Sequence, residues 1–479
     1  FSKKQKWIKT PKRLVFVDIS KSVARDAQNR EGGGYDEELV LDCQNTTSDE
    51  SDARDPSQVT DSALFPGSPS DRFILHEDGG APDRRFSHGP EQGGSLAGLR
   101  PHIYITKPVW PLTDPSEAEL FRHFVQKLAI WLDLCDPGQS FETIVPQRAG
   151  TCPILLNAIL ALSARHMSHI SNYDPLASNR YHQECLKYLI PMLSHAATVS
   201  DENLFAATII LRVLEEMEVK NMGMDNHGYL LGIHAFVKAG DRCLVPGTLS
   251  AASFWVGLRQ EIYSAVMNHE PVRIKLVHSL VDRSLRPADD YAWANRAVVH
   301  CADVLNFCFE TDARPAAARW AELDSWNKKW HETVPASFVP IYQKEGTEDA
   351  FPEFWYHSSC HVIGIQHHLL AELFLARFDP KVPRIGGQRK AAESQITQRI
   401  QQLVRRICGI GLGNQWTPPS MFTACMAIAA FGDHFHKRQD QEAMLDILRL
   451  TEKYHARPTE AVQHQIINTF KMTQDPSER

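Results

Sequence analysis

Histidine is the residue type that first suggests chemistry in this chain, because imidazole nitrogens bind metals and exchange protons near neutral pH. The dense groups are His166 with His169, His361 with His367 and His368, and His434 with His436. A zinc site on a helix needs ligands on one face, a third ligand and a nearby general base. No HExxH occurs, and no aspartate follows the two adjacent histidines. We interpret these histidines as structural, and we expect no metal site.

Paired acids suggest a second chemistry, in which an all-α cyclase holds magnesium against a diphosphate through a DDxxD-type cluster. The nearest candidates are Asp133 with Asp136, and Asp289 with Asp290. The first pair stands at a predicted helix end before a proline, and the second has no third acid at the right spacing. We therefore interpret Asp133, Asp136 and Arg165 as turn, capping and interhelix residues, and we predict no catalytic residue.

The glycine triplet Gly409, Gly411 and Gly413 could suggest a phosphate-binding loop. It follows a predicted helix and not a strand, so we expect a helix C-cap and turn rather than a dinucleotide site. The chain contains no GxSxG, Walker A or kinase signature. We expect no enzyme activity and no cofactor in this chain.

Composition restricts the class of protein. The chain has 479 residues, a hydrophobic fraction of 43% and a net charge of −7. The negative net charge argues against a protein whose surface is largely covered by bound nucleic acid. Its ten cysteines form no CxxC pair, which favours buried thiols in a reducing compartment. Without a membrane-length apolar run or a signal peptide, we expect an intracellular protein with no membrane partner. The first residue is Phe1, so we expect a fragment or a trimmed chain.

The first hundred residues read as a disordered linker (1–100). Residues 1–18 are basic, a pattern that suits phosphate contact, a nuclear-import signal or a solvated tail. Between Glu31 and Asp61 there are ten acidic residues and one basic residue, Arg54. Gly, Ser, Asp, Pro and Gln dominate the rest, so too little apolar area is available to offset the ordering entropy. The apolar island Leu39–Leu41 suits a weak activation or docking segment, or a plain linker.

Helical periodicity dominates from residue 101 to 479, so the predicted fold class is all-α, a multi-helix array. The region opens with an extended segment and a hairpin at Leu120–Ile170, whose first helix has a cap at Asp114 and a first-turn proline, Pro115. A DLCDP turn ends that helix near Asp133, and the next helix is expected from about Thr151. Further helices are predicted at 179–193, 201–218, 226–239, 251–268, 288–309, 316–330, 353–378, 394–407, 418–435, 441–455 and 459–472. No run of alternating strands is expected.

Six stretches carry a family resemblance. They are FRHFVQKLAIWLDLCDP at 121–137, PILLNAILALSARHMSHI at 153–170, YHQECLKYLIPML at 181–193, FWVGLRQEIYSAVMN at 254–268, VRRICGIGLGN at 404–414 and ACMAIAAFGDHFHKRQDQEAMLDIL at 424–448. In this order they resemble the fungal-specific transcription factor domain, the regulatory region of fungal zinc-cluster transcription factors, in the ARCA-like subgroup. The resemblance implies an α-helical regulatory domain at 101–479 in a nuclear regulator of RNA polymerase II transcription.

In such proteins a six-cysteine zinc cluster lies N-terminal and reads DNA in the major groove. This chain lacks the closely spaced cysteine pairs that such a cluster needs. The resemblance therefore leaves two readings, a cluster lost upstream of Phe1 or a natural cluster-less member. It implies DNA as a partner through the missing module, together with other transcription regulators or coactivators, a small-molecule inducer and a homodimer.

Two alternatives to the regulator stay open from the sequence. One is a cluster-less helical scaffold that docks or blocks other transcription factors, and the other is an all-α enzyme with a buried pocket. A pocket between helices is expected to draw on seven aromatic residues, which otherwise form core: Trp255, Tyr263, Trp293, Trp326, Trp330, Trp355 and Tyr356.

Overall fold

In the computed structural model, the described residues are 104–193, 200–218, 228–239, 245–276, 281–310, 317–346, 351–383 and 385–474. The disordered linker predicted for residues 1–100, with its basic start, acidic stretch and apolar island, lies outside them. The division at residue 101 stays a prediction. The described part belongs to one compact unit, residues 90–479.

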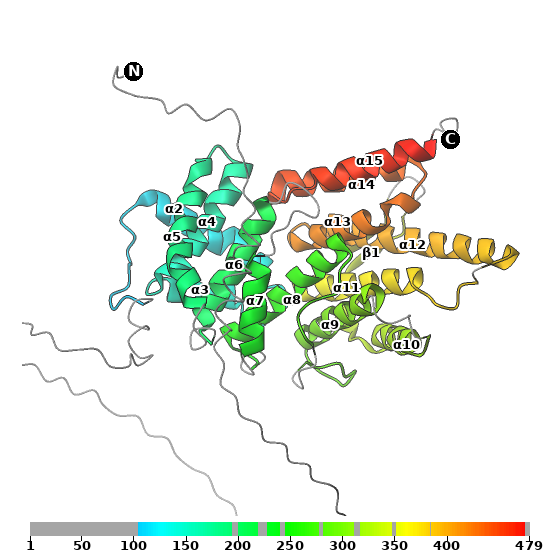
Figure 1. The fold of residues 1–479 in the computed structure, drawn as a ribbon, viewed down its shortest axis with the longest axis horizontal. Coiled ribbons are helices and arrows are strands. Elements are labelled where there is room, and N and C mark those ends of the chain that lie inside the picture. The colour runs from blue at the N-terminus through cyan, green and yellow to red at the C-terminus, as the bar shows by residue number, and fades with distance from the viewer. Residues whose placement is uncertain are drawn as a thin grey trace, which may run out of the picture. The chain divides into compact units, whose positions relative to one another are not determined.

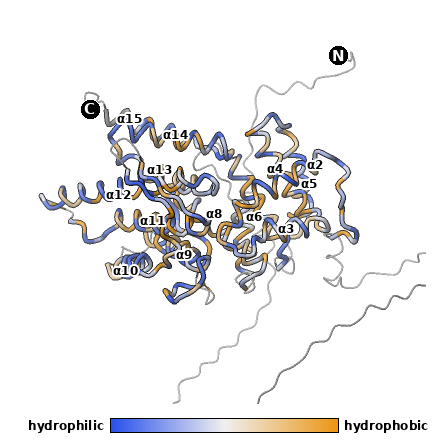
Figure 2. Tube along the Cα trace, turned by 180° about the vertical axis from the view of Figure 1, so that it is seen from behind, coloured by the Kyte–Doolittle hydropathy of each residue, from blue (hydrophilic) through white to orange (hydrophobic). Residues whose placement is uncertain are grey.

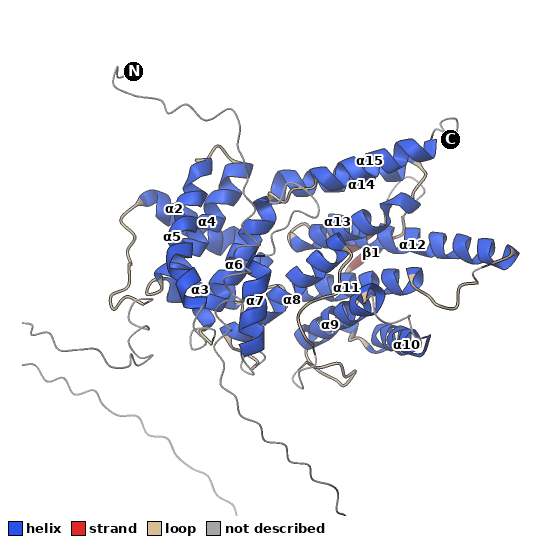
Figure 3. Ribbon diagram, viewed as in Figure 1, coloured by secondary structure: helices blue, strands red, loops and turns tan. Residues whose placement is uncertain are grey.

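The fold class is all-α, as predicted (Figures 1 and 3). The long helices are α2 (Pro115–His123), α3 (Ser140–Ala149), α4 (Pro153–Ile170), α5 (Pro175–Leu193), α6 (Glu202–Glu218), α7 (Gly228–Ala239), α8 (Leu249–Asn268), α9 (Asp290–Phe309), α10 (Ala317–Thr333), α11 (Ser359–Arg377), α12 (Gly387–Gly413), α13 (Pro419–Phe431), α14 (Arg438–His455) and α15 (Glu460–Gln474). The short elements are a π-helix, η3 (Phe124–Leu128), the 3₁₀ turns η4 (Ala129–Trp131), η6 (Ala336–Phe338) and η7 (Gly432–His434), and the strands β1 (Tyr342–Lys344) and β2 (Glu353–Trp355).

The opening hairpin begins as its sequence predicts. The Asp114 side chain accepts a hydrogen bond from the Ser116 amide and caps α2. The helix then widens into η3 and tightens into η4, so a single regular helix to Leu132 was the wrong expectation. The extended segment before α2 packs as expected, because the Ile105 and Val109 amides donate to carbonyls at Thr151 and Gly150.

Helix α3 was not predicted, and its N-terminus explains why Asp133 is buried. The two carboxylate oxygens of Asp133 accept hydrogen bonds from the amides of Phe141 and Glu142, at 2.9 and 2.8 Å. Asp136 accepts from the Gly138 and Ser140 amides beside it. Burial raises the pKa of the Asp133 carboxyl to about 7, while the two amide bonds act in the opposite direction. The capping role predicted for both acids is confirmed.

The middle and C-terminal helices pack around α8 and α11, whose buried faces form the centre of the core (Figure 2). Helix α8 packs on α6, α9 and α13, and α11 packs on α9, α12 and α13. Helix α14 runs back to contact α4, so the C-terminal region covers part of the opening hairpin (Figure 1). The core thus depends on helices that are hundreds of residues apart.

Two expectations for the 340–414 region were wrong. Residues 353–355 form β2, which pairs antiparallel with β1, where a helix was expected. Gly409 and Gly411 lie inside α12, and Gly413 is its last residue, where a C-cap and turn were expected. Close packing explains why glycine occurs within this helix. A Cβ at 409 would lie 1.9 Å from the Pro352 carbonyl oxygen, and a Cβ at 413 would lie 2.5 Å from the Phe354 carbonyl oxygen. Glycine is used here for backbone contact.

Candidate functional site

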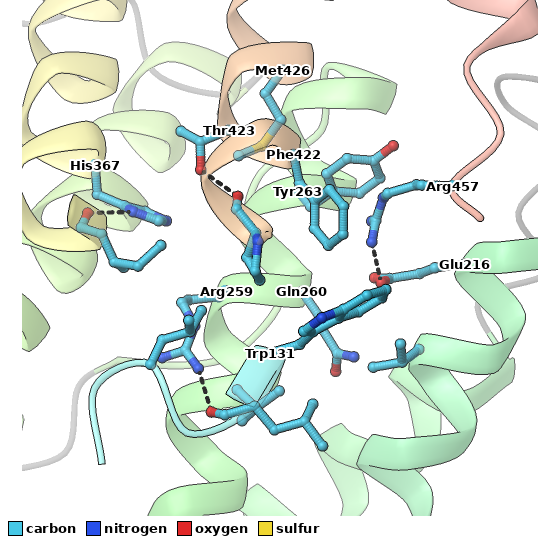
Figure 4. Close-up of a pocket in the computed structure, with 16 residues that line it drawn as sticks. Trp131, Glu216, Arg259, Gln260, Tyr263, His367, Phe422, Thr423, Met426 and Arg457 are labelled. Atoms are coloured by element: carbon cyan, nitrogen blue, oxygen red, sulfur yellow. Dashed lines mark hydrogen bonds and ion pairs between the residues drawn. The ribbon is translucent and has the colours of Figure 1, made fainter. Parts of the chain in front are cut away.

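A cavity of about 70 Å³ lies between helices α6, α8, α11 and α13, the η4 turn and the segment before α15 (Figure 4). Its walls are Trp131, Leu132, Leu134, Val213, Glu216, Val256, Arg259, Gln260, Tyr263, Ile363, His367, Pro419, Phe422, Thr423, Met426 and Arg457. The walls are mainly apolar, with two arginines, one glutamate and one histidine among them. Such a cavity, with few polar groups in an apolar wall, is the usual form of a small-molecule site.

Arg457 and Glu216 form a buried ion pair on one side of the cavity (Figure 4). The Arg457 Nη1 donates to Glu216 Oε2 at 2.8 Å. The guanidinium also lies over two rings, 3.9 Å from the Tyr263 centroid and 4.5 Å from that of Phe422. Burial acts to lower the pKa of Arg457, but the Glu216 carboxylate and Tyr263 outweigh it and raise the pKa. The other carboxylate oxygen of Glu216 lies 3.5 Å from Arg212 Nε, so Glu216 is the partner of two buried guanidiniums.

Arg259 and His367 lie across the cavity from that pair (Figure 4). The Arg259 Nη2 donates to the Leu132 carbonyl at 3.0 Å, which ties α8 to the turn after η4. The His367 Nδ1 donates to the Ile363 carbonyl one helical turn earlier, at 2.9 Å. Burial lowers the pKa of His367 to about 4, although the bond to Ile363 opposes the shift. His367 is thus neutral at physiological pH, with Nε2 left as an acceptor.

The structure gives several of the predicted histidines structural partners. His361 contacts Asp290 of α9 at 2.8 Å, and His166 contacts His123 at 3.0 Å. His368 stacks on the Trp330 ring, and burial sets its pKa well below the usual value. His434 lies 3.9 Å from Asp433, and His436 acts on His434 through space. Among the residues that the structure describes, no group of three or more His, Cys, Asp or Glu could hold a metal ion.

The predicted aromatic residues do not line one pocket together. Tyr263 alone of the seven lines the cavity. Trp293 packs edge-on against Trp330 in the core, and Trp326 stacks on His300. Trp355 is partly exposed on β2. Two further aromatic rings, those of Trp131 and Phe422, line the cavity and were not predicted for it.

Arg165 has the interhelix role that was predicted. Its Nη2 donates to Asn179 of α5 at 2.8 Å and to Glu218 of α6 at 2.5 Å. One arginine of α4 thereby joins three consecutive helices. The eight cysteines in the described ranges are free, and all but Cys308 are buried, which agrees with the expectation of buried thiols.

Sequence reasoning missed the polar cavity residues. Arg259 and Gln260 stand with Glu261 between Leu258 and Ile262 of α8, where three adjacent polar residues look like the solvated face of an amphipathic helix. Glu216 appeared within an acidic helix end, which looks solvated. Arg457 follows a helix and has no local pattern around it, so nothing near it in the sequence predicts its burial.

Comparison with known families matches a segment of the chain that includes several of the cavity residues. Residues 119–231 match the family model described as "Fungal specific transcription factor domain". These residues are similar to a fungal specific transcription factor domain. The match runs from α2 into α7 and confirms the first three resembling stretches. The later stretches and the ARCA-like subgroup stay predictions.

This fungal domain is the regulatory part of transcription regulators and is not typically an enzyme. No curated protein matches the chain, and no solved structure matches it. Within the described ranges, no helix is both long and apolar enough to cross a membrane. The matched segment supplies Trp131, Leu132, Leu134, Val213 and Glu216 to the cavity, and residues after 231 supply the remaining walls.

Proposed function

We propose that the protein is a nuclear regulator of RNA polymerase II transcription and that its helical part, residues 104–474, controls the activity of the whole protein. The match to the fungal transcription factor domain is the observation that carries the proposal. DNA contact through a module outside the described residues, binding of coactivators or other regulators, and self-association into a homodimer are parts of the same proposal.

The cavity is the proposed control element, because it lies where the matched segment meets the later helices. A ligand there would contact α6 and α8 and also α13 and Arg457. It would thereby change the free energy of docking the C-terminal helices. A ligand that binds one arrangement of these helices better than another shifts the population toward it, which is what an inducer must do.

A binding role fits the cavity better than a catalytic one. Glu216 is neutralised by Arg457, and the Thr423 hydroxyl donates to the Pro419 carbonyl. A catalytic pair needs a nucleophile within hydrogen-bond reach of a base. The hydrogen bonds resolved for Thr423, His367 and Glu216 go to other groups, and none of them joins two of these residues.

The test is to tether the full chain to a promoter through a foreign DNA-binding domain in a fungal host. We expect transcription of the reporter to change severalfold, up or down, relative to the foreign domain alone. A reporter without the cognate sites is the control. An unchanged reporter, with the fusion present in the nucleus, would overturn the regulator proposal. Capture of another transcription factor by the same inactive fusion would then favour the scaffold alternative.

A further inference from the structure

His367 of α11 presents an unpartnered nitrogen at the wall of the cavity. Its Nδ1 donates to the Ile363 carbonyl at 2.9 Å, so Nδ1 carries the proton and Nε2 is the acceptor of the neutral ring. Among the described residues no group donates to Nε2. From the Ile363 carbonyl the ring extends toward the residues of the other walls (Figure 4).

This nitrogen differs from the other unpartnered polar atoms of the lining residues in being reachable. Arg259 Nη1 and Gln260 Oε1 also have no partner, but the protein leaves them almost no accessible surface. His367 Nε2 is not among these closed atoms. Because the His367 side chain is only 2% exposed and lines the cavity, the surface that Nε2 retains faces the cavity.

The charge at this wall selects the kind of donor that Nε2 can accept from. Burial lowers the pKa of His367 to about 4, and Arg259 adds to the lowering through space, so the ring is neutral. A cationic ligand would meet the same positive charge of Arg259. An ionised carboxylate has no proton to donate. A neutral hydroxyl supplies the donor without either cost.

The size of the cavity limits the ligand. An engineered cavity of about 150 Å³ holds one benzene ring, and this cavity is about 70 Å³, so it holds a molecule of about half that size. Leu134, Val256 and Met426 line it with apolar surface. We propose that the cavity binds a short-chain alcohol, with its hydroxyl donating to His367 Nε2 and its alkyl group on the apolar wall. This rests on the proposed function, since it names the chemical class of the effector.

The first experiment compares ethanol with dimethyl ether, its isomer without an O–H group, by saturation-transfer NMR titration of the full chain. A ligand this small reaches only millimolar affinity, which suits a method that detects the free ligand. We expect ethanol to bind about fivefold more tightly than dimethyl ether, the difference that a neutral hydrogen bond makes. Equal binding of the two isomers would overturn the proposal.

A series of alcohols tests whether the cavity is the place of binding. From methanol through ethanol to 1-propanol, each added carbon buries more apolar surface, and we expect the Kd to fall about threefold per carbon. The Kd should then rise at 1-hexanol, which exceeds the cavity. A gain that continues through 1-hexanol would place the alcohols on an open apolar surface and contradict the cavity site.

A pair of variants assigns the hydrogen bond. His367→Phe keeps a ring of similar size, removes Nε2 and should abolish the preference for ethanol over dimethyl ether. His300→Phe is the matched control, because His300 is also buried in the core and does not line the cavity. A preference that survives His367→Phe, or that is lost in both variants, contradicts the role of His367. If His367→Phe does not fold, the two isomers and the alcohol series on the unaltered protein still decide.

The titration and the reporter test fail independently. Selective ethanol binding without any effect of the tethered chain on transcription would remove the regulator proposal and keep the ligand class. A transcriptional effect without selective binding would do the reverse.

Discussion

Arg457 Nη1 donates to Glu216 Oε2 at 2.8 Å, and the two residues are 241 positions apart in the chain. The bond joins α6, within the matched fungal domain, to the segment between α14 and α15. Both side chains are almost fully buried, and the guanidinium lies over the rings of Tyr263 and Phe422. The C-terminal region is thus held to the opening region by a charged contact inside the cavity wall.

Removing one partner of this pair should be costly. Glu216→Ala leaves the Arg457 charge buried and unpaired, so we expect a loss of about 3–5 kcal/mol in the free energy of unfolding. Urea unfolding of the full chain measures it. Glu218→Ala, which breaks the more exposed pair with Arg165, is the control and should cost about 1 kcal/mol or less. Equal losses for the two variants would contradict the burial argument.

The glycine at 409 should be intolerant of a side chain. Gly409→Ala places a Cβ against the Pro352 carbonyl oxygen, so α12 must move away from β2, at a cost of about 1–3 kcal/mol. Gly387→Ala in the first turn of the same helix meets no atom within 4 Å and should be neutral or slightly stabilising. Thermal unfolding of both variants checks this. A Gly409→Ala protein as stable as the parent would show that the contact can relax.

Acid should destabilise the protein through its buried histidines. Burial lowers the pKa of His300 to about 3 and that of His367 to about 4, whereas the unfolded value is about 6.5. Between pH 6.5 and 4 the unfolded chain therefore binds protons that the folded chain does not. Each such histidine lowers the free energy of unfolding by up to about 1.4 kcal/mol per pH unit as the pH falls.

The variant His300→Gln isolates one of these contributions. Its free energy of unfolding, measured by urea at several pH values, should fall less steeply between pH 6.5 and 4 than that of the parent. His464→Gln, at an exposed position of α15, controls for the loss of a histidine. Identical slopes in the parent and His300→Gln would rule out a buried neutral imidazole at this position.

The buried cap of α3 should contribute more to the free energy of unfolding than an exposed helix cap does. Asp133→Ala leaves the Phe141 and Glu142 amides without their acceptor, and we expect a loss of about 2–4 kcal/mol. Asp174→Ala, which removes the exposed cap on the Leu176 amide, should cost about 1 kcal/mol. Chemical denaturation compares the two. Similar losses would mean that water replaces Asp133 without penalty.

The helices with strong local signals could be predicted from the sequence. Helix α8 was expected at 251–268 and runs from Leu249 to Asn268, because its apolar stripe and the Thr248 cap are both local. Helix α3 was missed because it contains Pro146 and its cap, Asp133, lies before the turn that precedes it. Local periodicity gave no reason to continue a helix through that proline.

The cavity could not be predicted, because its polar members meet only through tertiary packing. Glu216, Arg259 and Arg457 come from three separate parts of the chain. The glycines of α12 show the same limit: their spacing resembles a turn, and only the position of Pro352 against the helix explains them. Residue type was visible in the sequence, but the partner of each residue was not.

The contact between Glu216 and Arg457 shows that the boundary of the family match differs from the boundary of the folded unit. The family match ends at residue 231, yet Val213, Leu214 and Met217 of α6 are buried in the complete fold, and the cavity beside them is closed by residues from α8 onward. A fragment cut at the family boundary would present this apolar helix face to water, with Glu216 lacking its Arg457 partner. The unit recognised by sequence comparison is thus smaller than the unit that can fold, and protein made for binding studies should extend beyond Arg457.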